Sequence, residues 1–155
     1  MIELAPRPTP TDPLPFVPPV PVVQVHDGVR LVAVDVPGDG FVDVRLLWSR
    51  GWAHEPDELD GITELTARLV GNATEELDPY ALACAAESIG ASLRASVGSE
   101  SFTLAVDVVR DGLEPAVDLL LDSLRRPDLS DAHVDRVRTE AVDARRRHLA
   151  DPVRL

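Results

Sequence analysis

The stretch from Phe41 to Leu69 changes its hydrophobic period once, and this change constrains the fold more than any other feature of the chain. Up to Arg50, apolar and polar residues alternate, as in a strand with one wet face, with apolar residues at Val42, Val44, Leu46 and Trp48. After a polar loop at 51–60, apolar residues recur at the spacing of one buried helix stripe, at Ile62, Leu65, Leu69 and Val70. Asp60 is the expected N-cap of this helix. A strand and the helix after it must therefore share one core.

Two further patterns predict hairpins. Between Val22 and Val36, two apolar runs flank Asp27-Gly28, a dipeptide that suits a type I′ turn because both residues tolerate positive φ. Residues 91–97 and 101–109 read as a second pair of strands, with Gly98-Ser99 at the turn. Strands that follow one another through tight turns indicate an antiparallel sheet.

The remaining segments are helical. A second helix is predicted from Asp78-Pro79, a good N-cap and first-turn pair, to Gly90. A third begins near Leu113 and ends at Pro127, and Ser130 precedes a long final helix. Strands and helices are segregated rather than alternating singly. We therefore expect an α+β fold, with a mostly antiparallel sheet covered by helices on one face.

The first 21 residues hold eight of the 14 prolines. Because proline lacks an amide donor and fixes φ, this segment is predicted to be an extended arm without regular structure. The arm suits either a groove on another protein or a path along its own subunit or a partner subunit. We expect two parts, the arm at 1–21 and one α+β domain at 22–155, with the alternative that this domain is incomplete.

Composition excludes several classes of function. With 15 basic and 27 acidic residues, the net charge is −12, which disfavours binding to nucleic acids and to anionic membrane surfaces. No apolar run approaches the roughly 18 residues of a spanning helix, and no signal peptide is visible. Cys84, the only cysteine, is expected to be a small buried hydrophobe in a reducing compartment. The expected location is cytoplasmic.

The histidines do not form a catalytic or metal-binding set. His54 lies in the segment His54-Glu55-Pro56-Asp57-Glu58, where Pro56 prevents helical i, i+4 geometry, so we interpret this segment as structural. His26, His133 and His148 occur singly and are interpreted as surface or helix-capping groups. No glycine-rich loop precedes a helix, so phosphate binding is not indicated.

Four segments and the order of the strands and helices together carry a resemblance. The segments are 50–56, 61–69, 71–74 and 87–91, and with the element order they resemble the N-terminal half-domain of pitrilysin/insulinase-like zinc peptidases. This family includes the mitochondrial processing peptidases and bacterial relatives. The resemblance runs from about Val22 to Pro152 and implies the family's α+β repeat.

The catalytic members of that family carry an inverted zinc motif, HxxEH, on the helix after the loop. Its two histidines, at i and i+4, bind zinc from one helix face, and the glutamate activates the zinc-bound water. Aligned on Gly61, the resemblance places Glu64, Ala67 and Arg68 at the His, Glu and His positions. Ala67 cannot accept a proton and Arg68 is a cation, so we expect no catalytic and no metal-binding residue here. Glu64 and Arg68 should instead form an i, i+4 ion pair.

The resemblance also suggests two weaker correspondences. The family's third zinc ligand is a glutamate on the long helix, and its position falls near Asp143 or Ala144. The family holds substrate along an edge strand often marked by Asn-Ala, and the matching dipeptide here is Arg94-Ala95. Arg94 is thus a weak substrate-binding candidate that departs from the pattern.

The resemblance implies a non-catalytic subunit that pairs with an HxxEH-bearing subunit to close a peptidase chamber and help bind peptide. This chain would need no cofactor, and zinc would lie in the partner. The acidic surface would favour basic or neutral peptides. Two alternatives are a structural or scaffold protein of the same fold, without a proteolytic role, and an isolated binding module.

Overall fold

The computed structural model describes residues 20–36, 38 and 40–150. Of the predicted proline-rich arm, residues 1–19 lie outside the described residues. The chain divides into two compact units, Met1–Asp39 and Gly40–Leu155, which are considered separately. Within the described residues, no helix is both long and apolar enough to cross a membrane.

The first unit contains a two-stranded hairpin. Strands β1 (Val22–His26) and β2 (Val29–Ala33) pair in antiparallel register from Val22 opposite Ala33 to His26 opposite Val29. Asp27 and Gly28 have φ values of 48° and 82°, which confirms the predicted type I′ turn. The apolar side chains of both strands are exposed, and two strands alone cannot bury both of their faces.

The second unit is built on a three-stranded antiparallel sheet. Strand β5 (Phe102–Val109) is central, with β3 (Phe41–Trp48) on one side and β4 (Ala91–Val97) on the other. The register places Val106 opposite Val44 and Leu93, so β-branched and leucine side chains form rows across one face. Strand β4 is therefore an edge strand of this sheet in the described part of the chain.

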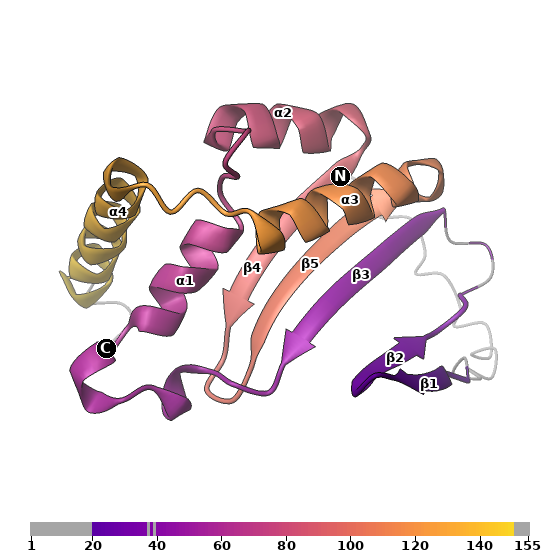
Figure 1. Ribbon diagram of the computed structural model, residues 1–155, viewed down its shortest axis with the longest axis horizontal. Coiled ribbons are helices and arrows are strands. Elements are labelled where there is room, and N and C mark those ends of the chain that lie inside the picture. The colour runs from indigo at the N-terminus through magenta and orange to yellow at the C-terminus, as the bar shows by residue number, and fades with distance from the viewer. Residues whose placement is uncertain (1–19, 37, 39, 151–155) are drawn as a thin grey trace, which may run out of the picture. The chain divides into compact units, whose positions relative to one another are not determined.

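Helices cover one face of the sheet, as Figure 1 shows. They are α1 (Ile62–Val70), α2 (Pro79–Ser88) and α3 (Leu113–Arg125), while α4 (Asp131–Ala150) lies beside α1. Short 3₁₀ turns occur at η1 (Trp52–His54), η2 (Asp57–Leu59) and η3 (Arg110–Gly112). The buried core comprises Val70, Ala86, Ala91, Leu104, Val106, Val108, Ala116 and Leu120. The predicted α+β fold with helices on one face is confirmed.

Three predictions about burial are wrong. Cys84 is exposed, because α2 buries Leu82 and Ala86 and a residue midway between them lies on the opposite side of the helix. Ile62 is 41% exposed, since it opens α1 before the buried stripe begins. His133 is buried, with 6% exposure, because it lies one turn before the buried Val137 on the same face of α4.

Candidate functional site

Backbone contacts fix the loop that leads into α1. Gly51 lies against the turn between β4 and β5, and a Cβ atom there would be 2.1 Å from the Gly98 carbonyl oxygen. The amides of Trp52 and Ala53 donate to the carbonyls of Gly98 and Ser99, at 3.2 and 2.9 Å. The first residues of the loop are therefore held at the end of the sheet.

Glu55 caps α1 from a distance. Its carboxylate accepts hydrogen bonds from the amides of Gly61, at 2.8 Å, and Thr63, at 2.7 Å. The expected cap, Asp60, does not fill this role: the N-cap residue is Gly61, with φ of 90° and no side chain to offer. The loop thus folds back so that a carboxylate six residues upstream satisfies the helix N-terminus. The interpretation of 54–58 as structural agrees with this contact.

Stability should depend on the ionised form of Glu55. Hydrogen bonds from the Thr63 side chain, and from the backbone amides of Gly61 and Thr63, lower the pKa of this carboxyl. A lowered folded-state pKa means that the stabilisation is present above the unfolded pKa and is lost as the pH falls through the folded pKa. We expect Glu55→Gln to lower the melting temperature at pH 7, with a difference from the parent that shrinks towards pH 3.

Thermal melts followed by circular dichroism at pH 7, 5, 4 and 3 measure this difference. Glu58→Gln is the matched control, since Glu58 lies in the same loop and has no hydrogen bond to the α1 amides among the described residues. If the difference in melting temperature between Glu55→Gln and the parent stays constant down to pH 3, the ionised Glu55 carboxylate does not stabilise the start of α1.

Helix α1 presents the three positions singled out in the sequence. Arg68 binds Glu64 through Nη2 and Nε, at 2.8 and 3.2 Å from the same carboxylate oxygen. The predicted i, i+4 ion pair therefore forms. Ala67 is 4% exposed and faces the interior. This helix face therefore presents the Arg68 guanidinium, which is bound to Glu64, and the methyl group of Ala67.

Arg68 also lines a hollow between three elements. The hollow has a volume of about 170 Å³ and is bordered by Ala67, Arg68, Gly71, Asn72, Ala95, Val137 and Glu140. Gly71 and Ala95 approach closely in its lining, because a Cβ at Gly71 would lie 2.9 Å from that of Ala95. The end of α1, strand β4 and the middle of α4 thus border one small open hollow.

The residues around this hollow do not suit a zinc ion. Zinc needs three or four thiolate, imidazole or carboxylate ligands, and the lining offers the single carboxylate of Glu140. The guanidinium of Arg68 would repel a divalent cation. Among the described residues, no group of three or more His, Cys, Asp or Glu is arranged to hold a metal.

Backbone hydrogen bonds between the segment after α1 and the segment before α4 set the position of α4. Thr74 and Pro127 form an isolated antiparallel bridge, and the amide of Glu75 donates to the carbonyl of Arg126 at 2.9 Å. The amide of Asp128 donates to the carbonyl of Ala73 at 3.2 Å. The segment after α1 and the segment before α4 are therefore tied together, which brings α4 beside α1.

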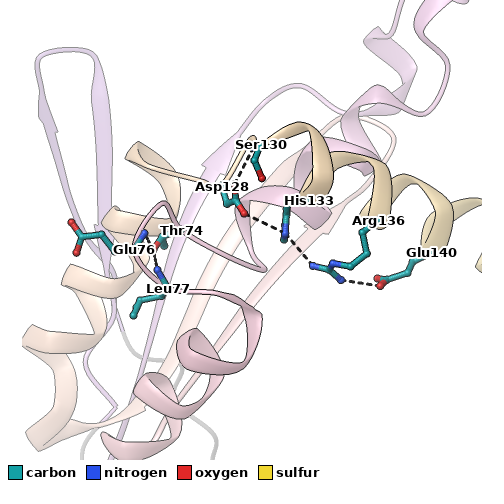
Figure 2. Close-up of polar contacts among 8 residues, drawn as sticks. All are labelled: Thr74, Glu76, Leu77, Asp128, Ser130, His133, Arg136 and Glu140. Atoms are coloured by element: carbon teal, nitrogen blue, oxygen red, sulfur yellow. Dashed lines mark hydrogen bonds and ion pairs between the residues drawn. The ribbon is translucent and has the colours of Figure 1, made fainter.

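A chain of polar contacts runs along the first turns of α4 (Figure 2). Asp128 accepts from the Ser130 amide at 2.9 Å and lies 3.5 Å from Nδ1 of His133. Arg136 contacts the same Nδ1 at 3.1 Å and donates to Glu140 at 2.8 Å. A guanidinium can only donate, so the contact with Arg136 needs Nδ1 as an acceptor, whereas a hydrogen bond to Asp128 would need it as a donor. Chiefly because of the Ser130 backbone amide, the pKa of Asp128 is lowered.

Arg94 points away from the hollow. It lies on the other face of β4, where it pairs with Asp107 and lies 3.6 Å from Asp43. Arg45 binds Asp43 through two hydrogen bonds, at 2.7 and 2.8 Å, and these are the main reason why the pKa of Asp43 is lowered. Two arginines and two aspartates thus neutralise one another on the face of the sheet that α1, α2 and α3 leave uncovered.

Asp143 lies one turn beyond Glu140 on α4. It is half-exposed and lies 3.5 Å from Arg146. Neither Asp143 nor Ala144, the two positions suggested for the third ligand, is among the residues that border the hollow.

Sequence reasoning did not single out Glu140, although its i, i+4 spacing from Arg136 is a signal for an ion pair. Nor did it find the buried His133 or the capping role of Glu55, which depend on contacts between separate elements.

Comparison with known proteins identifies the family. Residues 30–153 match the model of the insulinase family of peptidases, peptidase family M16, so the chain belongs to this family. The fold resembles that of a protease from Helicobacter pylori, with a TM-score of 0.79, 17% identity and coverage of 89% of this chain and 34% of that one. It also resembles a peptidase M16 inactive domain from Pseudomonas fluorescens, with a TM-score of 0.77, 17% identity and coverage of 85% and 32%.

The two solved structures are compared at the level of fold. At 17% identity they show a common architecture, and this chain spans about a third of the length of each. Sequence comparison with curated proteins gives no significant match.

Proposed function

We propose that this chain is a non-catalytic part of a two-subunit peptidase of the insulinase family. It pairs with an HxxEH-bearing subunit, closes the chamber and helps to hold the peptide. The observation that carries this proposal is the α1 face, where Glu64 and Arg68 bind each other and Ala67 is buried. In catalytic members of the family that the chain resembles, the corresponding positions carry the zinc-binding histidines and the water-activating glutamate.

Edge strand β4 supports a role in holding peptide. Within the described residues β4 pairs only with β5, so its outer row of N–H and C=O groups is available to an added strand. Because Arg94 is balanced by Asp107 and Asp43, the strand presents no uncompensated charge on that face. The net charge of −12 favours basic or neutral peptides over acidic ones.

The two-subunit proposal predicts that zinc and activity reside in the partner. Purified alone, the chain is expected to bind no stoichiometric zinc and to cleave no peptide, because its α1 face has no histidine and its one carboxylate there, Glu64, binds Arg68. Mixed with an HxxEH-bearing relative from the same organism, preferably one encoded next to it, it should form a complex that cleaves peptides faster than the relative alone. Metal analysis, size-exclusion chromatography and a quenched-fluorescence peptide library measure these outcomes.

A triple variant tests the register of α1. Glu64→His, Ala67→Glu and Arg68→His together should give the chain zinc binding that the parent lacks, because two histidines at i and i+4 share one helix face. Zinc-dependent hydrolysis by the unmodified chain would refute the proposal. A stable complex without any increase in cleavage would favour a scaffold role instead.

A further inference from the structure

The hollow beside α1 holds two opposite charges that do not bind each other. Arg68 contributes from α1 and Glu140 from α4, but each is engaged by a residue of its own helix, Glu64 and Arg136 respectively. These partners use Nε and Nη2 of Arg68 and Oε1 of Glu140. Among the described residues, Nη1 of Arg68 and Oε2 of Glu140 have no partner. Each of these two residues at the border of the hollow therefore keeps one charged atom that no other described residue binds.

These two groups restrict what the hollow can accept. A carboxylate would be repelled by Glu140, and an ammonium group would be repelled by Arg68. An apolar side chain would cover both polar groups without giving them hydrogen bonds, which is costly. A primary amide both accepts and donates, so its oxygen matches Arg68 and its NH₂ matches Glu140. The side chain of Asn72, also at the hollow, adds a further amide.

Strand β4 places a peptide side chain within reach of this space. Ala95 borders the hollow, whereas Arg94 lies on the opposite face of the strand. The side chains of an extended peptide that pairs with the outer edge of β4 would also alternate between the two faces of the sheet. Every second side chain would therefore lie on the same face as Ala95. A side chain beside Ala95 would then point towards Arg68 and Glu140.

We propose that this hollow is a subsite for the side-chain amide of a glutamine or asparagine in a peptide bound along β4. The proposal rests on the peptide-holding role proposed above and names the chemistry of one position. The hollow, at about 170 Å³, has far more room than a single water molecule requires, which suits a group of a few heavy atoms.

Peptide binding to the full chain tests the subsite. Fluorescein-labelled host peptides rich in threonine and serine carry glutamine, glutamate, lysine or leucine at one position, which is scanned along the peptide. At the position opposite Ala95, fluorescence anisotropy should show the glutamine peptide binding about tenfold more tightly than the other three, the effect of one hydrogen bond to a charged group.

Two variants should replace the preference for the glutamine peptide with a preference for a charged peptide. Arg68→Met leaves Glu140 and should make the lysine peptide the tightest of the four. Glu140→Leu leaves Arg68 and should make the glutamate peptide the tightest. Both side chains are substantially exposed, so folding should be retained, and circular dichroism checks this. Asp143→Leu, one turn further along α4, is the control and should leave the glutamine preference unchanged.

The peptide-binding results test the amide subsite and the peptide-holding role separately. Equal affinity for all four peptides, or variants that keep the parental ranking, would overturn the amide subsite while leaving strand addition to β4 intact. Failure of every peptide to bind would overturn the subsite and the peptide-holding role together. Pairing with an HxxEH subunit is measured independently by the complex formation described above.

Discussion

Leu104→Ala is expected to lower the free energy of unfolding by about 2–5 kcal/mol. Leu104 has no exposed surface and lies on the central strand β5, with β3 and β4 hydrogen-bonded on either side. Those pairings keep the backbone from closing onto the vacated space. The variant therefore loses both the transfer free energy of the side chain and the packing contacts around the cavity. Urea unfolding followed by circular dichroism measures the change.

Leu47→Ala is the matched control for this experiment. Leu47 lies on the neighbouring strand β3, directly after Leu46, which is opposite Leu104, so its side chain lies on the other face of the sheet and is 67% exposed. Its replacement is expected to change the free energy of unfolding by no more than about 0.5 kcal/mol. Similar losses in the two variants would contradict the assignment of the core to the helix-covered face.

Gly51→Ala is expected to destabilise the second unit strongly through steric conflict. The added Cβ would lie 2.1 Å from the Gly98 oxygen and 2.6 Å from the Ser101 nitrogen, and both are backbone atoms that cannot rotate away. Gly51 has an extended backbone, with φ of −130°, so the conflict is spatial and not conformational. Overpacking alone costs about 1–3 kcal/mol. Separating the loop from the turn would also break the Trp52 and Ala53 hydrogen bonds, at about 1 kcal/mol each.

Gly40→Ala provides the comparison for this variant. Nothing lies within 4 Å of a Cβ at Gly40, and its φ is not positive, so this variant should be as stable as the parent or slightly more stable. Hydrogen exchange of the Trp52 and Ala53 amides reports whether the loop has separated. Retained protection at these amides in Gly51→Ala would show that the turn accommodates the methyl group.

The sequence predicted best what depends on near neighbours. The type I′ hairpin at Asp27-Gly28 follows from residues that tolerate positive φ, and the start of α2 at Pro79 follows from a cap whose carboxylate accepts from Ala81 at 2.8 Å. The Glu64–Arg68 pair is likewise a property of one helix face. Family membership, suggested by segments spread from 50 to 91, is confirmed by the match over residues 30–153.

The sequence failed where a residue's surroundings come from a distant segment. The burial of His133 requires α4 to be tied to the segment after α1 through Thr74 and Pro127. Cys84 looked apolar in its local run, yet the sheet lies on the other side of α2. Asp60 looked like a cap by position, but the folded loop brings the Glu55 carboxylate to the same amides.

By itself, the sequence determined the periods of the strands and helices, and which side chains occupy positions 64, 67 and 68 of α1. These follow from backbone preferences and side-chain types, which act over a few residues. Only the tertiary structure decided that Arg68, Ala95 and Glu140 border one hollow, and that Arg94 lies on the opposite face of β4. Those relations depend on how α1, β4 and α4 pack together, and packing joins residues that no local pattern relates.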